Sequence, residues 1–229
     1  MNRQLTLDLP LREARGRGDF FVSPANALAL AALDGWQGWP AAKAVLAGPP
    51  GSGKTHLAHI WSAATGARIL AATALPGADL PALATAPVVV EDAQQIGGIP
   101  AAENALFHLH NLMAAAALPL LVTASAPPRD WGLRLPDLAS RMQAATLIRL
   151  DAPDDALLHA VLAKQFADRQ IAVPPGLIDW LVPRMTRSFQ TARDVVTALD
   201  ARALEEAGPI TRQMAADWLD GDSLFPDLD

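Results

Sequence analysis

The segment Gly48-Pro49-Pro50-Gly51-Ser52-Gly53-Lys54-Thr55 constrains the fold more than any other part of the sequence. It matches the pattern G-x-x-x-x-G-K-[ST], in which glycines let successive backbone N–H groups face phosphate oxygens. An apolar run at 44–47 precedes it and helical periodicity follows at 55–65, as this loop requires. The sequence therefore predicts a site for a purine nucleoside triphosphate or diphosphate. A Gly/Pro-rich turn before a helix is the alternative.

The residue types of this loop predict individual roles toward ATP or ADP and Mg²⁺. Lys54 is expected to reach the β- and γ-phosphates, and Thr55 is expected to hold the metal ion. His56 is placed at the same site by its position, with a packing or surface role as the alternative. The other residues predicted to surround the nucleotide are Gly48, Pro50, Gly51, Ser52 and Gly53.

A second apolar run, Val88-Val89-Val90, ends in the acidic pair Glu91-Asp92. In phosphate-loop proteins one such carboxylate holds the metal's water shell and the next orients the attacking water. We therefore predict Glu91 as a metal residue and both carboxylates as candidate catalytic residues, with simple loop capping as the alternative. The usual order is Asp then Glu, so nucleotide binding is better supported than rapid hydrolysis.

Short apolar runs alternate with helical stretches in the first two thirds of the chain, which predicts a three-layer α/β domain with a parallel sheet. After Pro153 only helical periodicity remains, which predicts a small all-helical lid domain. The expected parts are an N-terminal tail (1–18), the nucleotide-binding α/β domain (19–151), the lid (152–220) and an acidic tail (221–229). The predicted strands are 44–47, 68–71, 88–90, 118–123 and 146–150; the predicted helices are 55–65, 103–116, 156–169, 176–185, 189–206 and 211–219.

Composition narrows the function classes. The chain has 229 residues, no cysteine and a formal net charge of −6, which argues against a large electrostatic footprint on DNA. It shows no secretory signal and no apolar run of the roughly 20 residues that a membrane helix needs. We therefore expect a cytoplasmic protein that does not contact the membrane.

Further boxes, in order along the chain, make it resemble an AAA+ ATPase of the DnaA branch. Phe20-Phe21-Val22 with Asn26 resembles the adenine-side box, which implies that Val22 and Asn26 contact the nucleotide. The segment 121–128 resembles the sensor 1 strand, with Ser125 where the family tends to have Asp or Asn. Leu138-Ala139-Ser140-Arg141 resembles the box that carries the arginine finger, and 192–196 resembles the sensor 2 helix.

The resemblance implies roles for two arginines. Arg141 would act in trans on the nucleotide of a neighbouring subunit, and a surface arginine paired with Asp137 is the alternative. Arg193 would contact the chain's own nucleotide, and pairing with Asp194 or Asp200 is the alternative. Together, Ser125 and the Glu91-Asp92 order suggest weak intrinsic ATP hydrolysis and a protein that stays bound to ADP.

Two features make the chain resemble Hda-type regulators of DnaA within that branch. The sequence stops after the predicted lid, and Gln4-Leu5-Thr6-Leu7-Asp8-Leu9 resembles a peptide that binds the replicative sliding clamp, the DNA polymerase III beta subunit. Gln4 would donate hydrogen bonds while Leu5, Leu7 and Leu9 fill apolar pockets, although alternating leucines also suit an edge strand.

These resemblances imply a regulator of replication initiation that binds the clamp and stimulates ATP hydrolysis by DnaA. DNA would be reached only indirectly through the clamp, and a homodimer is possible. Two alternatives stay open: a DnaA-like adaptor whose nucleotide is structural, and a helicase-loader-type ATPase that hydrolyses its own ATP.

Overall fold

The computed structural model describes residues 21–222. A five-stranded parallel sheet in the order β2-β3-β4-β1-β5 forms its centre. The strands are β1 (Lys43–Ala47), β2 (Arg68–Ala71), β3 (Val88–Glu91), β4 (Leu120–Ala124) and β5 (Thr146–Arg149). The predicted α/β fold with a parallel sheet is thus confirmed.

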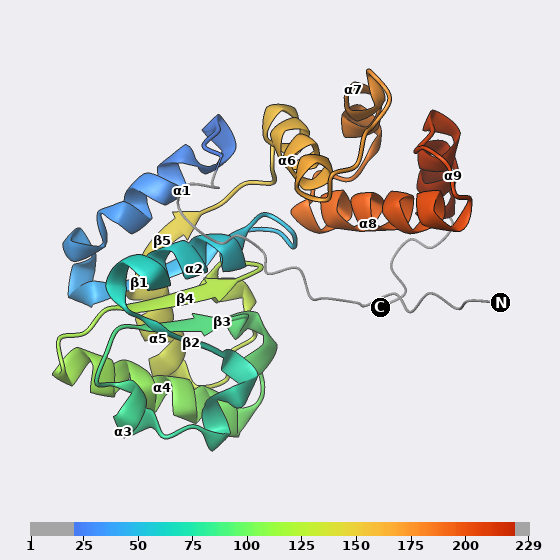
Figure 1. The fold of residues 1–229 in the computed structure, drawn as a ribbon. Coiled ribbons are helices and arrows are strands. Elements are labelled where there is room, and N and C mark those ends of the chain that lie inside the picture. Colours follow the sequence, from blue (N-terminus) through green and yellow to red (C-terminus); the bar gives the residue numbers. More distant parts are fainter. Residues whose placement is uncertain (1–20, 223–229) are drawn as a thin grey trace.

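Helices cover both faces of this sheet (Figure 1). Alternate residues of β1 supply the two faces: Val45 and Ala47 pack with α3, α4 and α5, whereas Ala44 and Leu46 pack with α1 and α2. β1 and β4 are buried throughout and β3 is buried up to Glu91, but the edge strands β2 and β5 are partly exposed. The covering helices are α1 (Pro24–Asp34), α2 (Lys54–Thr65), α3 (Leu80–Leu83), α4 (Pro100–Ala115) and α5 (Pro136–Ala144).

The chain then forms a helical part with an apolar core of its own (Figure 1). Phe166, Leu181 and Leu199 are among its fully buried side chains. Its N-terminal helix is capped by Asp154, whose side chain accepts a hydrogen bond from the Leu157 N–H. The helices are α6 (Asp155–Asp168), α7 (Leu177–Leu181), α8 (Phe189–Glu205) and α9 (Arg212–Asp222).

Within residues 21–222, no helix is both long and apolar enough to cross a membrane.

Candidate nucleotide site

The phosphate-loop motif lies at the carboxyl end of β1, where it opens α2. Gly53, in the left-handed region at φ 97°, forms the N-cap of α2. The loop bends so that the Lys54 side chain returns to its own start: the Lys54 Nζ donates to the carbonyl oxygens of Gly48 and Pro49, both at 2.8 Å. The N–H groups in the first turn of α2, at the positive end of the helix dipole, favour an anion in front of the loop.

The Lys54 ammonium is held without a direct carboxylate partner in the described part of the chain. Burial lowers the pKa of Lys54, and the charge of Asp92 partly opposes this shift. A cation that is 9% exposed and bound only to neutral carbonyl oxygens gains more from an added phosphate than a solvated lysine does. The loop therefore suits a polyanionic ligand.

Two buried polar atoms of the predicted site lack a hydrogen-bond partner in the described part of the chain. The Ser52 Oγ and the Glu91 Oε1 are buried, and neither has a hydrogen-bond partner among residues 21–222. Buried polar atoms are normally satisfied, and each exception calls for a physical reason. A phosphate oxygen is a partner that suits the Ser52 hydroxyl, which lines the ligand cleft, whereas Glu91 does not line it and its metal role stays a prediction.

The acidic pair continues from β3 into a tight turn. Asp92 adopts a left-handed conformation at φ 57°, and its N–H donates to the Thr123 Oγ1 on β4 at 3.2 Å. This turn separates the two carboxylates: Asp92 lines the cleft described below, whereas Glu91 is not part of its lining. The order Glu91-Asp92 thus places the shorter side chain toward the ligand cleft.

Gln94, in the short helix Ala93–Ile96, bridges the acidic turn and the chain just after β4. Its Oε1 accepts from the Ser125 N–H at 3.0 Å, and its Nε2 lies 3.5 Å from the Asp92 Oδ1. Gln94 therefore contacts two of the predicted site residues, the Asp92 carboxylate and the backbone N–H of Ser125. Sequence reasoning missed it, because a lone glutamine after an acidic pair is an ordinary loop residue.

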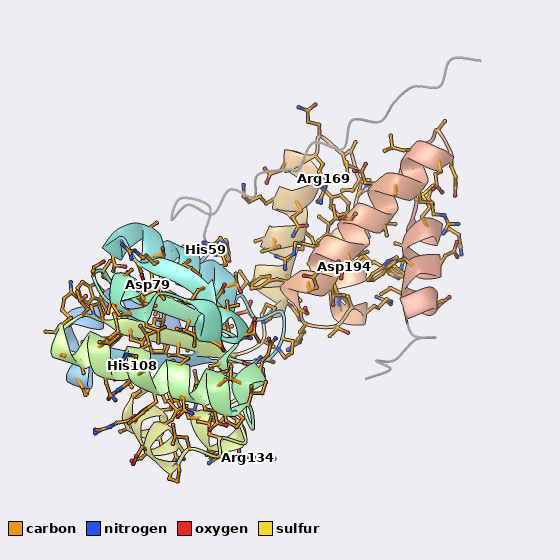
Figure 2. The ribbon with its side chains drawn as sticks, turned by 90° about the horizontal axis from the view of Figure 1, so that it is seen from below. His59, Asp79, His108, Arg134, Arg169 and Asp194 are labelled. Carbon is orange, nitrogen blue, oxygen red and sulfur yellow. The ribbon has the colours of Figure 1, made fainter. Side chains whose placement is uncertain are left out.

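A cleft of about 1150 Å³ lies between the phosphate loop and the helical part. A cleft of this size exceeds the roughly 300–1,000 Å³ of typical small-molecule sites. Several charged side chains of α6 and α8 and of the C-cap of α6 line it opposite the loop, and Figure 2 labels one of these, Arg169, just after the last residue of α6. The described residues of this lining that carry charge are Lys54, Asp92, Lys164, Asp168, Arg169 and Arg193.

The start of α8 packs directly onto the phosphate loop. The Phe189 N–H donates to the Gly51 carbonyl oxygen at 2.8 Å, and the Phe189 ring lies against Gly53. Ser188 caps α8, with its Oγ accepting from the Gln190 N–H at 3.1 Å, and it lies against Gly51. Ser188 and Phe189 were not predicted as site residues, although a serine before a helical run is a recognisable N-cap. We call this contact the α8 latch.

Replacing Gly51 by alanine is expected to open the α8 latch. Gly51 has φ 70°, which costs a residue with a Cβ about 1–2 kcal/mol, and its Cβ would lie 1.9 Å from the Ser188 Oγ. Gly66 is the matched control, because it has φ 73° but no atom within 4 Å of its Cβ. We expect Gly51→Ala to weaken nucleotide binding at least about tenfold, equivalent to about 1.4 kcal/mol. Gly66→Ala should lower only the free energy of unfolding.

Both quantities are accessible from nucleotide titration and denaturant unfolding of each variant. Equal nucleotide affinities in Gly51→Ala and Gly66→Ala would mean that the α8 latch does not act on the site.

The predicted adenine-side residues occupy different places. Asn26 lines the cleft, and its side chain also accepts from the Ser23 N–H and donates to the Phe21 carbonyl oxygen, both at 2.9 Å. Asn26 thereby completes the capping box of α1 and fixes the segment that carries Phe21, another lining residue. Val22 is 52% exposed and is not part of the lining.

Thr55, His56 and Arg193 all line the cleft. Arg193 comes from the first turns of α8, and its Nη2 donates to the Gln190 Oε1 at 2.8 Å. Gln190 in turn donates to Asp194 at 2.7 Å. The Arg193 guanidinium therefore stands on the lid side of the same cleft that the phosphate loop lines.

Arg141 lies far from this cleft. It is an exposed residue in the last turn of α5, just before β5, which starts opposite Ala44 near the start of β1. Within the described residues it forms no hydrogen bond or ion pair, and the alternative pairing with Asp137 is absent there. Its charge nevertheless acts on His110: burial lowers the pKa of His110, a hydrogen bond with Asn111 opposes this, and the nearby Lys43 and Arg141 lower it further.

The four residues of the predicted clamp peptide, Gln4, Leu5, Leu7 and Leu9, lie outside the described residues. Within 21–222, no cluster of three or more histidine, cysteine, aspartate or glutamate side chains could hold a metal ion by itself. Mg²⁺ usually keeps several water and phosphate oxygens as ligands, so it needs few ligands from the protein itself.

The chain is similar in sequence to the chromosomal replication initiator protein DnaA of Sphingopyxis alaskensis, with 27% identity over 133 residues. This match covers 58% of the present chain but only 29% of that DnaA. No family model matches the chain.

Solved structures share the fold. Domain III of the replication initiation protein DnaA from Thermotoga maritima has a TM-score of 0.78 at 16% identity, covering 95% of this chain and 100% of that one. AMPPCP-bound DnaA from Aquifex aeolicus has a TM-score of 0.66 at 15% identity, covering 81% of this chain and 65% of that one. The Holliday junction branch migration motor RuvB from Thermotoga maritima has a TM-score of 0.59 at 19% identity, covering 76% and 60%. The chain therefore has the P-loop AAA+ fold in a DnaA-like form.

Proposed function

We propose that this protein is a nucleotide-bound regulator of chromosome replication initiation, which stimulates ATP hydrolysis by DnaA through Arg141. The observation that carries the proposal is the separation of Arg141 from the chain's own phosphate loop. The length of β1 alone, five residues at about 3.3 Å each, puts more than about 10 Å between the amino and carboxyl ends of the parallel strands. An exposed arginine there can act only on a nucleotide held by another molecule.

ATP or ADP would be held between the phosphate loop and the helical part. Lys54 and the N–H groups of the loop would bind the phosphates, Thr55 would hold Mg²⁺, and Arg193 would approach from α8. The metal ion would neutralise phosphate charge when bound. Binding of AMPPCP by the structurally similar Aquifex aeolicus DnaA supports this part of the proposal.

Slow hydrolysis of the chain's own nucleotide follows from the residues around the cleft. Asp92 reaches less far than a glutamate would, and its carboxylate lies beside the Gln94 amide. Ser125 offers a hydroxyl where a carboxylate would orient water more strongly. These features favour a lasting ADP-bound form that keeps the two parts of the protein together.

Recruitment would occur through residues 4–9. An extended peptide that buries alternate leucines in apolar pockets can tether the protein to a clamp that is already loaded on DNA. The tether raises the local concentration of Arg141 near DnaA on the same DNA, while the acidic chain itself needs no DNA contact. DnaA and the sliding clamp are thus the proposed partners.

The direct test is the rate of ATP hydrolysis by purified DnaA with and without this protein and DNA-loaded clamp. We expect stimulation with the full chain, and a loss of about 10²-fold at low protein concentration when residues 1–9 are deleted, because the tether is lost. The truncated protein should regain activity at high concentration.

Each alternative predicts a different result in the same assay. A nucleotide-bound adaptor would bind ATP or ADP without changing DnaA hydrolysis at any concentration. A helicase-loader-type ATPase would hydrolyse its own ATP on single-stranded DNA in the absence of DnaA. Either result would overturn the proposed function.

A further inference from the structure

Glu103 is a buried acidic residue with no place in the nucleotide site. It lies in the first turn of α4 and is 1% exposed. Isolated buried carboxylates are costly, and they persist where hydrogen bonds or charges compensate them. The partners of Glu103 therefore indicate what it does.

Three backbone N–H groups from two different segments converge on this carboxylate. The Gly98 N–H donates to Oε1 at 2.7 Å, and the Leu135 N–H donates to Oε2 at 2.7 Å. The Arg134 N–H donates to both oxygens, at 3.1 and 3.0 Å. Gly98 belongs to the loop that follows β3, whereas Arg134 and Leu135 lead into α5.

Arg134 and Leu135 need the Glu103 carboxylate because α5 has no side-chain cap of its own. Leu135 is the N-cap residue and makes no side-chain cap hydrogen bond, and Pro136 follows at the first helical position. The first N–H groups of a helix have no partners inside it, and its positive end favours a carboxylate. Glu103 therefore caps α5 from a neighbouring helix.

The ionisation of Glu103 agrees with this geometry. Burial raises the pKa of Glu103, but the N–H groups of Arg134, Leu135 and Gly98 and the charge of Arg134 together bring it below its ordinary value. The carboxylate is therefore charged at neutral pH. The contribution of Glu103 to the free energy of unfolding is therefore fully present above the ordinary pKa of a glutamate. It is lost as the pH falls through the lowered pKa of the folded state.

A close backbone contact also joins the two segments that Glu103 connects, the loop before α4 and the chain that leads to α5; we call this place the junction. A Cβ on Gly97 would lie 1.8 Å from the Trp131 carbonyl oxygen, so the loop after β3 packs directly on the chain that leads to α5. The Trp131 Nε1 donates to the Ala126 carbonyl oxygen at 2.7 Å, which joins the end of β4 to the same place. Figure 2 shows Arg134 beside α5, on the side of the α/β part away from Arg169.

Arg141 lies on the helix that starts at this junction. It follows Leu135 by six residues, and α5 is otherwise held by Leu138 and Met142, which are buried in the core. Apolar contacts are not directional, whereas hydrogen bonds have a preferred direction and therefore also constrain the orientation of a helix. The cap at Glu103 therefore completes the constraint on where Arg141 points.

We propose that Glu103 is the positioning residue for Arg141, joining the loop after β3 to the start of α5 through its three backbone N–H contacts. This inference rests on the proposed function for its effect on DnaA, while the cap itself is independent of that function. Gly98 follows Asp92 by six residues, so the short helix Ala93–Ile96 links the acidic turn along the chain to this junction.

Glu103→Gln tests the proposal. Glutamine keeps the shape but turns an NH₂ group toward N–H donors and removes the charge, so at least one N–H contact is lost. Misplacement by about 1 Å can cost about 10²-fold in rate, and we expect stimulation of DnaA at saturating protein to fall at least tenfold. The apparent affinity for DnaA and the affinity for ADP should stay within about twofold, since neither surface is altered. Glu205→Gln, an exposed glutamate of α8, is the matched control and should behave as wild type.

A double-mutant cycle separates positioning from a general loss of structure. If Glu103 acts through Arg141, Glu103→Gln should cause no further loss in an Arg141→Ala background. Additive losses would overturn the proposal.

A second measurement does not depend on DnaA. Hydrogen exchange of the Gly98, Arg134 and Leu135 amides should accelerate at least tenfold in Glu103→Gln while exchange in β1 and β4 stays unchanged. Unchanged exchange at these amides would refute the cap even if DnaA were stimulated. A wild-type protein that shows these protected amides but does not stimulate DnaA would refute the proposed function alone.

Discussion

Replacing Arg141 by alanine is expected to reduce the stimulation of DnaA ATP hydrolysis by about 10³-fold, because arginine fingers contribute about 10³–10⁵ in rate. The guanidinium offers a planar set of donors to the developing charge on the γ-phosphate, and alanine offers none. Arg141→Lys should recover only a small part of the rate, since an ammonium cannot form the bidentate contact. The measurement is single-turnover hydrolysis of ATP bound to DnaA, with DNA-loaded clamp in excess.

Two controls accompany the Arg141 variants. Arg184→Ala removes an exposed arginine from the helical part, where Arg212 still stacks on Trp180, and it should leave the stimulation unchanged. The affinity of Arg141→Ala for its own ADP should equal that of the wild type, because Arg141 lies near the amino ends of the strands and the phosphate loop at the carboxyl end of β1. Full stimulation by Arg141→Ala would refute the finger assignment.

Replacing Lys54 by alanine should weaken binding of ATP and ADP by about 100-fold. A charge-assisted hydrogen bond contributes about 1.5–3 kcal/mol, and about 1.4 kcal/mol corresponds to a factor of ten. The fold should persist, because Lys54 forms no ion pair in the described part of the chain and its bond to the Pro49 carbonyl oxygen is only partly buried, so water can replace the Nζ there. Titration with a fluorescent ADP analogue gives the affinity directly.

The matched control is Lys164→Ala, which removes a lysine from the rim of the same cleft. Lys164 pairs with Asp168 at 3.2 Å and is partly exposed, so we expect a change of about threefold or less, as for a weak surface pair. The ADP-dependent rise in melting temperature should disappear in Lys54→Ala and persist in Lys164→Ala. Equal affinities in the two lysine variants would show that the phosphate loop does not bind the nucleotide.

The sheet and the phosphate loop could be predicted because they rest on local signals. Val88-Val89-Val90 and the run before Gly48 are continuous apolar stretches, which is how strands covered on both faces appear. The motif at 48–55 is flanked in the sequence by a predicted strand and a predicted helix, and the structure places it at the carboxyl end of β1. These signals need no knowledge of distant residues.

Other parts depend on contacts between segments far apart in the sequence. Helix α5 was not predicted, because Leu135-Pro136 offers no side-chain cap and its cap, Glu103, comes from 32 residues earlier. Helix α1 was missed as well, since its run of alanine and leucine has only a weak polar face. Gln94 was missed because its partner Ser125 is 31 residues away. The roles of Glu103 and Gln94 arise from burial and from hydrogen bonds between distant segments, which the local sequence pattern does not show.

Because the α8 latch fixes the start of α8 at the phosphate loop, a rotation of this helix about its first residue would displace its far end. Helix α8 contains 17 residues, so it extends about 25 Å at 1.5 Å per residue. Its first residue touches the phosphate loop, whereas its far end carries Arg202, which pairs with Asp217 of α9 at 2.8 Å. By simple trigonometry a rotation of about 10° at Phe189 moves the other end by about 4 Å. In the proposed nucleotide-bound form, a change at the phosphate loop that rotated α8 by this angle would move α9 by about the width of a side chain.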